Sequence, residues 1–486
     1  MLKKLFRESF IYGISRYISK FIGVFLLPLY TSVLAPQDYG ILDLLGTITL
    51  VSSFLIISGT DSALGYYYFR KEYISERPVM ISSALWLRII FSLTACVIIL
   101  ILAPNLSFLL FGKDVSLFVI ITALTLIFSN IYSFLMDLLR FELRPWLYSV
   151  YSTGGVLINI LLTIYFVLIL KQGVYGALIA SAIAYGVLFL FTCIYVFRKY
   201  GLGFSAKWIK DITKYGFPLI GTGIAVWVLG STDRYFLAHY QGLDINGIYA
   251  VGKKMAEAIG MVAGALQLAW GPFAMDIQYE SNAKKTYAKV FILFSLINII
   301  VVFGISMFAI DILKILTQPE YYSAMAVVPF LCLSTVLSSA YFIVAIGINI
   351  TKKLQHTIWI TIAAAALNII LNFFLTPVYG AIGASFSIMT ANFLIFILTL
   401  IISQKHYRIN FRFGSILIIF FPSALVVTLT YILEFKLVPR IIISTLFLSA
   451  IGIYLYNIFK HSSDFKKLVG MLKNIFRMDV SKSSEP

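Results

Sequence analysis

The chain has 486 residues, of which 60% are apolar and only 12% are charged, and its mean hydropathy is +0.94. This composition excludes an ordinary soluble domain, in which about a quarter of the residues are charged. The formal net charge is +17, which in a soluble protein would suggest nucleic-acid binding. Membrane topology explains the excess here, so we expect no nucleic-acid partner. The composition predicts an all-α polytopic membrane protein.

Apolar runs of about 20 residues, the length that crosses ~30 Å of hydrocarbon, recur from end to end. Their connections are short, and none has room for a soluble domain. The runs predict fourteen spans: 11–33, 41–63, 79–102, 115–136, 146–170, 174–197, 216–238, 246–271, 288–310, 324–350, 356–376, 380–403, 413–434 and 438–459.

The N-terminus MLKKLFRESF has the basic start of a signal peptide, but the apolar run that follows is long and lacks a small-residue cleavage site. We expect this run to remain as the first span. The three cysteines are single and far apart inside apolar runs, which favours neither a disulfide framework nor a zinc site: Cys96, Cys193 and Cys332. We expect no metal site, no cofactor and no catalytic residues.

Fourteen spans place both termini on one side of the membrane. The connections and tails on that side hold 27 Lys or Arg residues, whereas the opposite side holds five. By the positive-inside rule both termini are expected to be cytoplasmic, and in a bacterium the membrane would be the inner membrane. The remaining six cations lie within spans.

Two predicted cytoplasmic segments are amphipathic. In 200–215, Phe204, Trp208 and Ile212 recur every four residues between lysines. This pattern is typical of a helix that lies on an anionic leaflet. The tail 464–477 shows the same pattern, although a solvated basic connector explains that segment equally well.

An internal repeat relates the two parts of the chain. Gly40 precedes the second span and Gly247 precedes the eighth, 207 residues later, while Asn159 matches Asn368 at an offset of 209. A VYGAxxAS motif opens the sixth and the twelfth span. Six spans repeated once keep the same orientation, so the repeats are parallel and related by an axis along the membrane normal.

The repeat predicts two six-helix lobes that face each other across a cavity. We expect five segments: the N-terminal lobe, an amphipathic interlobe linker, the C-terminal lobe, two additional membrane helices without a counterpart, and a basic cytoplasmic tail, at 1–199, 200–215, 216–404, 405–460 and 461–486.

The opening YGISRYISKFIGVFLLPLYTSVLAPQDYGILDLL, the stretch STDRYFLAHYQGLDINGIYAVGKKM and the segment VYGAIGAS resemble the polysaccharide transporters, the O-antigen (Wzx-type) flippases of the multidrug/oligosaccharidyl-lipid/polysaccharide (MOP) exporter superfamily. The resemblance covers essentially the whole chain. It implies translocation of an undecaprenyl-pyrophosphate-linked oligosaccharide between leaflets, with membrane lipids and other polysaccharide-assembly membrane proteins as candidate partners. Cavity residues vary widely in this family, so the resemblance carries over no site motif.

Six cations within the spans are the candidate substrate-binding residues, because a charge at a helix centre costs roughly 2.5 to 3.5 kcal/mol and normally faces a polar cavity or a partner. A cationic cavity would hold the pyrophosphate. For Arg16 and Arg234, which lie near span ends, the alternative is that the side chain snorkels to the membrane surface. For Lys253 the alternative is a salt bridge with Glu257. The six are Arg16, Lys20, Arg88, Arg234, Lys253 and Lys254.

Four carboxylates within or beside the spans are candidates for coupling transport to H⁺ or Na⁺, since a carboxylate beside a cation in low dielectric can be held near its protonation threshold. They are Asp61, Asp233, Glu257 and Asp43. Simple ion pairing, for instance of Asp233 with a neighbouring helix, is the alternative for these residues.

Two rival functions remain open. A drug/cation antiporter on a similar twelve-span plan would need an acidic site in its first span, where this chain has Arg16 and Lys20; these favour an anionic substrate. A membrane glycosyltransferase or polysaccharide polymerase would need a sizeable outward loop, but the largest predicted outward segments are only 104–114 and 311–323. We therefore expect a transporter and not an enzyme.

Overall fold

The computed structural model describes residues 26–57, 59–217, 220–351, 353, 355–433 and 435–459; the side chains of 222, 262, 265, 266, 268, 269, 272 and 454–459 are outside this description. The described residues form helices and connecting turns without any strand, and the all-α prediction is confirmed. This follows from the bilayer, because a spanning segment must satisfy every backbone polar group internally.

The first part of the chain contains α2 (Leu26–Val33), α3 (Pro36–Ile57), α4 (Thr60–Tyr68), the 3₁₀ turn η1 (Lys71–Tyr73), α5 (Arg77–Phe111), α6 (Ser116–Phe141), α7 (Pro145–Thr163), its π-helical continuation η2 (Ile164–Ile169) and α8 (Gly173–Tyr200). The short α9 (Ala206–Gly216) leads to the second part.

The second part contains α10 (Ile220–Tyr240), α11 (Leu243–Asp276), α12 (Ala283–Met307), α13 (Ala309–Leu316), the 3₁₀ turn η4 (Pro319–Ala326), α14 (Val328–Val344), α15 (Ile346–Ile350) and α16 (Gln355–His406). The last two helices are α17 (Phe413–Ile432) and α18 (Leu437–Phe459).

Nine helices of the described residues are long and apolar enough to cross a membrane, which confirms a multi-pass membrane protein. The helices α10 and α11 have 21 and 34 residues but are not among the nine. They carry five of the intramembrane charges singled out above. Their length suits a span, and their charge requires partners inside the protein.

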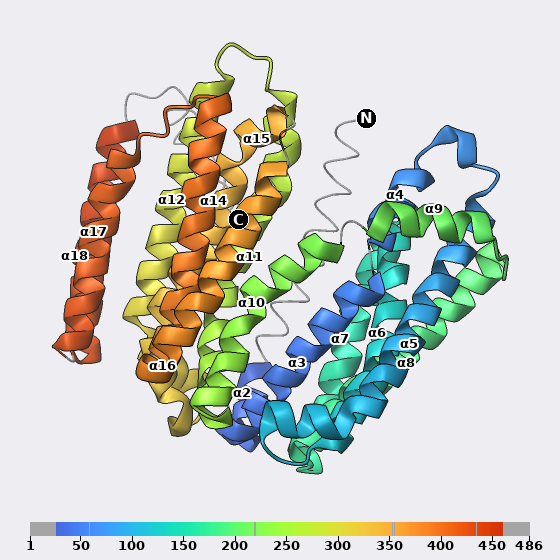
Figure 1. Cartoon of the computed structure of the whole chain (residues 1–486). Helices are drawn as coiled ribbons and strands as arrows, with labels where there is room; N and C mark the ends of the chain where they lie inside the picture. The colour runs from blue at the N-terminus through green and yellow to red at the C-terminus, as the bar shows by residue number, and fades with distance from the viewer. Residues whose placement is uncertain are drawn as a thin grey trace, which may run out of the picture.

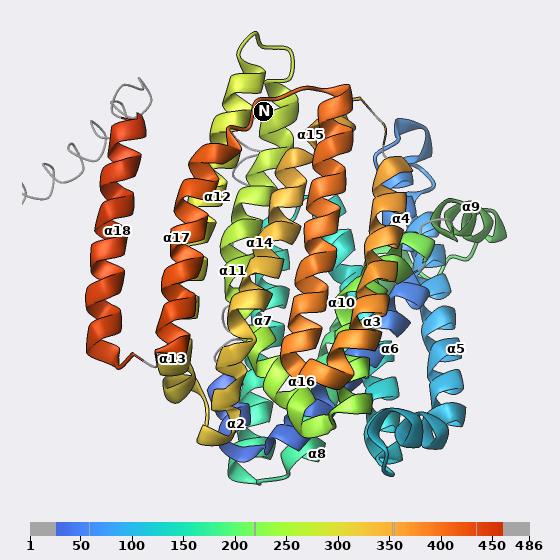
Figure 2. The same ribbon diagram turned by 60° about the vertical axis from the view of Figure 1, so that its left-hand side comes forward.

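Most predicted spans agree with the helices where both are described, but 41–63 is divided between α3 and α4, and 324–350 begins in η4 and is divided between α14 and α15. The span 174–197 corresponds to α8, and 115–136 corresponds to α6. The spans 356–376 and 380–403 are joined as α16, which turns back at Gly380, whose φ is +54° (Figure 2). That left-handed conformation is one that glycine adopts without strain. Most of the predicted first span and the basic tail are outside the described residues.

The helices form two bundles arranged as a V (Figure 1). The first bundle contains α3 and α5 to α8; the second contains α11, α12, α14 and α16, with α17 and α18 at its outer edge. The bundles meet near α2, α3 and α10 at one end and diverge toward the end where α4 and α9 lie. The lobe boundaries inferred from the repeat stay predictions.

Helix α9 differs from the expectation of a helix resting on lipid. Trp208 and Ile212 are 1% and 0% exposed and pack against α4, α5 and their neighbours. The Trp208 indole N–H also donates to Glu76 Oε2 at 3.0 Å. Only Phe204, at 62% exposed, remains on the outside. The prediction of a lipid-facing apolar stripe is wrong for Trp208 and Ile212, because periodicity identifies an apolar face but not what covers it.

Candidate substrate site between the two halves

The two halves approach most closely where α3 crosses α11. A Cβ atom placed on Gly40 would lie 2.1 Å from the carbonyl oxygen of Leu243, and one on Gly247 would lie 1.9 Å from the carbonyl oxygen of Pro36. Only a residue without Cβ permits such backbone contact. Gly40 and Gly247 are also the pair matched by the internal repeat. Equivalent residues of the two copies therefore meet at the closed end of the V.

Hydrogen bonds from the second half to backbone carbonyls of the first half reinforce this end. Asn246 Nδ2 donates to the Gly40 oxygen at 3.2 Å, and the Tyr321 hydroxyl donates to the Leu34 oxygen at 2.8 Å. Both donor residues are fully buried. The closed end is thus held by contacts that a relative movement of the halves would have to break.

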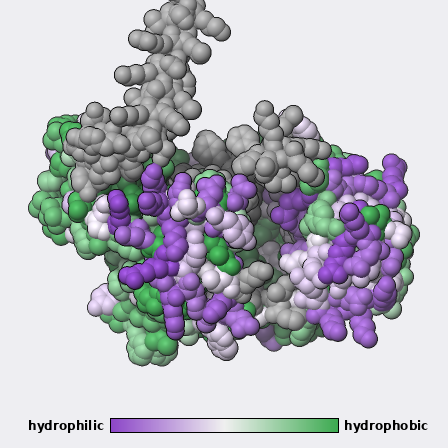
Figure 3. Space-filling view, turned by 90° about the horizontal axis from the view of Figure 1, so that it is seen from above, coloured by the Kyte–Doolittle hydropathy of each residue, from purple (hydrophilic) through white to green (hydrophobic). Residues whose placement is uncertain are grey.

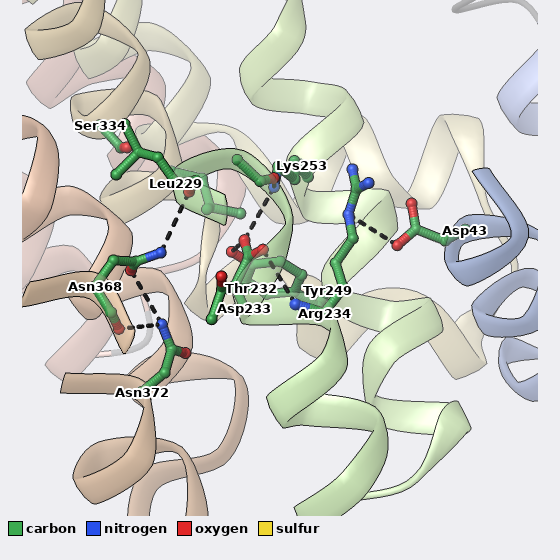
Figure 4. A network of polar contacts seen from close by, with 12 residues as sticks. Asp43, Leu229, Thr232, Asp233, Arg234, Tyr249, Lys253, Ser334, Asn368 and Asn372 are labelled. Carbon is green, nitrogen blue, oxygen red and sulfur yellow. Dashed lines mark hydrogen bonds and ion pairs between the residues drawn. The ribbon is translucent and has the colours of Figure 1, made fainter. Parts of the chain in front are cut away.

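Helices α10 and α11 bring the central charges together (Figure 4). Asp233 is 0% exposed. Its Oδ2 lies 2.9 Å from Lys253 Nζ and accepts a hydrogen bond from the Tyr249 hydroxyl. Lys253 also donates to the Gly230 carbonyl oxygen at 2.9 Å. A buried carboxylate requires this degree of compensation, so the Asp233 to Lys253 pair fixes α10 against α11.

Arg234 points away from this pair and toward the first half (Figure 4). Its Nε lies 3.0 Å from Asp43 Oδ2 on α3, and the two side chains are 14% and 12% exposed. The two atoms are at ion-pair distance but lack the alignment of a hydrogen bond. Arg234 and Asp43 therefore form a charge contact between the halves, whose imperfect geometry leaves donors and acceptors unused.

Lys254 and Glu257 form a separate pair on α11. Their charged atoms are 2.9 Å apart, and the side chains are 43% and 51% exposed. The alternative considered from the sequence paired Glu257 with Lys253, but the structure pairs it with Lys254 and gives Lys253 to Asp233. An exposed pair of this kind contributes only about 0 to 1 kcal/mol, so both charges remain available to a ligand.

Arg88 lies apart from these charges, within the first half. It is 1% exposed, and its guanidinium nitrogens lie 3.2 Å from Ser133 Oγ and 3.3 Å from Thr60 Oγ1. The half-buried Asp61 is one of its electrostatic neighbours. The structure thus places Arg88 among α4, α5 and α6 rather than beside Lys253. Arg16 and Lys20 lie outside the described residues.

An amide ladder on α16, absent from the candidates above, packs against α10. Asn368 Nδ2 donates to the Leu229 carbonyl oxygen at 3.2 Å, and Asn372 Nδ2 donates to Asn368 Oδ1 at 3.0 Å (Figure 4). One turn further on, Thr376 Oγ1 donates to Asn372 Oδ1 at 2.9 Å. All three side chains are fully buried. The internal repeat, which matches Asn159 with Asn368, was the sequence signal that could have identified this amide ladder.

Tyr249 was also missed among the site residues. It precedes Lys253 by four residues and so shares a helix face with it, but a tyrosine in an apolar run gives no sign of its partner. Within the described ranges, His, Cys, Asp and Glu side chains form no group of three or more that could hold a metal ion.

The open end of the V is polar on both sides. Seen from that end, hydrophilic side chains cover much of the described surface of both halves, and a recess separates the halves (Figure 3). The charged residues of α10 and α11 lie on the side of the second half that faces the first half, where Arg234 meets Asp43.

Comparisons with known proteins match this chain to one family model, to distant relatives and to solved structures of similar fold. The family model described as polysaccharide biosynthesis protein matches residues 31–267. An uncharacterized membrane protein of Methanocaldococcus jannaschii is 22% identical over 415 residues, which cover 80% of this chain and 94% of that protein.

Among solved structures, a lipid II flippase MurJ in an inward closed conformation has a TM-score of 0.74 at 15% identity and covers 93% of this chain and 100% of its own. An inward-facing multidrug resistance MATE family transporter of the MOP superfamily has a TM-score of 0.62 at 17% identity, covering 82% of this chain and 94% of its own. An outward-facing MATE structure has a TM-score of 0.53 at 18% identity, covering 83% and 95%. The identities are low, so these structures show the fold alone.

Proposed function

We propose that this chain is a transporter of the polysaccharide and lipid-linked flippase group of the MOP superfamily; the match to the family model and the shared fold support this proposal. The proposed substrate is an undecaprenyl-pyrophosphate-linked oligosaccharide, such as an O-antigen or capsule repeat unit. The proposed location is the bacterial inner membrane with both termini in the cytoplasm, so that the V opens toward the cytoplasm. Helix α9 belongs to the interlobe linker that is predicted to be cytoplasmic, and its place at the open end of the V supports this orientation (Figure 1).

The observation that carries the proposal is the group of cations on α10 and α11 at the boundary between the halves. Lys254 is 43% exposed and pairs with an exposed glutamate, Glu257, and Arg234 faces Asp43 without an aligned hydrogen bond. A guanidinium binds phosphate oxygens bidentately, and charge-assisted bonds of this type are the strong ones. A pyrophosphate entering the recess could therefore replace both carboxylate partners.

Exchange of partners would couple binding to movement. When Arg234 leaves Asp43 for a phosphate, one charge contact between α10 and α3 is lost, and the closed end is weakened. Asp43 and Glu257 would then be carboxylates without a cation, where H⁺ or Na⁺ could bind; Asp233 stays neutralised by Lys253. Asp61 remains a further candidate for ion coupling.

Arg16 and Lys20 remain part of the proposed cationic site, because the spacing of four residues puts them on one face of the first span. Arg88 is left out of the cavity: a side chain that is 1% exposed and surrounded by Thr60, Asn130 and Ser133 suits a role in joining helices of the first half.

The test uses cells that lack the chromosomal copy of this gene and express single variants. Arg234→Ala, Lys253→Ala and Lys254→Ala are each expected to lower surface polysaccharide at equal membrane abundance. Lys314→Ala, which removes an exposed cation from α13, serves as the matched control. Wild-type levels of surface polysaccharide in all three variants would refute the cationic site.

The alternative function is drug/cation antiport, which the MATE-like fold also supports. It predicts that overexpression raises resistance to cationic dyes and that the buried acid Asp233 is essential, whereas removal of Lys254 has little effect. Dye-resistance assays of Lys254→Ala and Asp233→Asn separate the two functions, because the flippase predicts a strong effect of Lys254→Ala on surface polysaccharide and no dye resistance.

A further inference from the structure

A compact aromatic stack lies where the ends of α4 and α9 meet. The rings of Tyr66 and Tyr215 are stacked with centroids 4.9 Å apart and an interplanar angle of 24°. Tyr67 meets both edge-on, at 5.1 Å and 6.3 Å. The Arg70 guanidinium carbon lies 4.3 Å from the centre of the Tyr66 ring. The offset and edge-to-face arrangements are those that aromatic rings favour.

The outer rings of this stack are partly exposed, whereas the residue on which the stack packs is buried. Tyr66 and Tyr215 are 42% and 40% exposed, whereas Trp208, which touches Tyr67 edge-on at 5.4 Å, is 1% exposed. The Arg70 side chain is 43% exposed and forms an ion pair with Glu72 at 2.9 Å. Among the described residues, the Tyr215 hydroxyl has no hydrogen-bond partner. The rings are therefore fixed by packing on the buried Trp208 side and accessible on the other side, and such a surface is preorganised for a ligand.

The position of the stack favours an internal site over a lipid anchor. A Cβ on Gly59 would lie 2.6 Å from the carbonyl oxygen of Gly216, so the start of α4 is in backbone contact with the end of α9. There the chain passes from the first half toward α10, and both helix ends lie at the open end of the V (Figure 1). Aromatic belts that anchor proteins in lipid lie around the outer surface instead.

We propose that this stack, formed by Tyr66, Tyr215 and Arg70 with Glu72, is a docking site for the sugar part of the lipid-linked substrate. The proposal rests on the proposed function. The C–H face of a pyranose ring packs on an aromatic ring, and its hydroxyl groups need donors and acceptors beside that ring. Tyr215 supplies the ring at the end of the stack, while Arg70, which lies against the neighbouring Tyr66 ring, and its partner Glu72 supply the donors and acceptors.

The separation from the cationic group suits a substrate with two ends. Tyr215 lies at the end of α9, whereas Arg234 lies 14 residues after the start of α10, which corresponds to about 21 Å along that helix. A pyrophosphate at Arg234 and Lys254 would therefore leave an extended chain of several sugars to reach the stack. Recognition at both ends would distinguish a complete oligosaccharide from the bare lipid pyrophosphate.

The experiment measures binding to the full chain in lipid nanodiscs with two probes. One is undecaprenyl pyrophosphate, and the other is the lipid-linked oligosaccharide extracted from cells that lack this protein. Wild type is expected to bind the sugar-bearing probe more tightly. Tyr215→Ala is expected to weaken that probe by about three- to tenfold, the effect of losing one aromatic stacking contact, and to leave undecaprenyl pyrophosphate unchanged.

Two further variants separate binding from folding. Tyr215→Trp keeps a stacking ring and should retain the preference for the sugar-bearing probe, and Tyr279→Ala, which removes a tyrosine that is 91% exposed on the other half, should change neither affinity. Equal affinity of Tyr215→Ala and wild type for the sugar-bearing probe, or equal weakening of both probes, overturns the docking site but leaves the proposed function standing. Failure of wild type to bind either probe refutes the proposed function and this site with it.

Discussion

The glycine crossing between α3 and α11 allows a sharp test of movement between the halves. In Gly247→Ala the new Cβ would lie 1.9 Å from the Pro36 carbonyl oxygen, and in Gly40→Ala it would lie 2.1 Å from the Leu243 carbonyl oxygen. Ordinary contacts are 3.4–4 Å, so the helices must separate by roughly 1.5 Å. A backbone carbonyl cannot rotate out of the way as a side chain can.

The size of the effect follows from the type of clash. Overpacking typically costs about 1 to 3 kcal/mol, and a contact with backbone should lie at the upper end of that range. If α3 and α11 touch only in the conformation in which this end of the V is closed, the clash destabilises that conformation alone. A difference of about 3 kcal/mol changes the ratio of two conformations about 150-fold. The variants should then favour the state in which this end has opened.

Spin labels on Leu143→Cys and Tyr279→Cys, in a background without the native cysteines, report the distance across the open end by pulsed electron resonance. Both sites are exposed and belong to different halves. Gly247→Ala should move the distribution to shorter distances. Gly40→Ala should have the same effect, and its control is Gly46→Ala on the same helix α3, where a Cβ would meet nothing within 4 Å and the distribution should stay unchanged. A lower melting temperature without any change of distance would show that both conformations keep the crossing, and the reasoning would be wrong.

Three other contacts give direct predictions. Asp43→Ala leaves Arg234 without its carboxylate and should lower the melting temperature, while the charge exchange Asp43→Arg with Arg234→Asp should recover stability but not transport. Arg440→Ala removes the partner of Asp311, whose Oδ2 lies 2.7 Å from Arg440 Nη1 in a partly buried ion pair. A loss of about 3 kcal/mol should be seen in denaturant unfolding, with Arg440→Lys intermediate. Trp208→Ala should cost about 3 to 5 kcal/mol and expose α9 to limited proteolysis; unchanged digestion would contradict its anchoring role.

Much of the fold could be predicted because the bilayer leaves few choices. A run such as 174–197 must become a helix to satisfy its backbone, and α8 (Gly173–Tyr200) differs only at its ends. The turn at Gly380 was also expected between two spans. What lies on each helix face was harder to predict: α9 shows an amphipathic pattern in sequence, yet protein rather than lipid covers Trp208.

The charged residues were identified from the sequence, but their partners were not. Spacing within a helix reveals neighbours at four residues, which suggested Lys253 with Glu257, whereas the structure pairs Lys253 with Asp233 of the adjacent helix. The side-chain direction around α11 decides between these partners, and sequence alone does not give the rotation of one helix against another. The contact of Gly40 with Gly247 was hidden for the same reason, although the repeat had matched the two residues.

The three charge pairs at the centre differ in a way that assigns them different roles. Breaking the pair of Lys253 with the fully buried Asp233 would leave an uncompensated charge at a cost of about 3 to 5 kcal/mol, so this pair should persist through transport. The exposed pair of Lys254 with Glu257 can be replaced by a contact with the substrate at little cost. Both partners lie on α11, so this replacement does not change the contact between the halves. Only Arg234 with Asp43 joins the two halves. A pyrophosphate that takes Arg234 therefore acts on the one central ion pair, among the described residues, whose loss can be transmitted to the closed end.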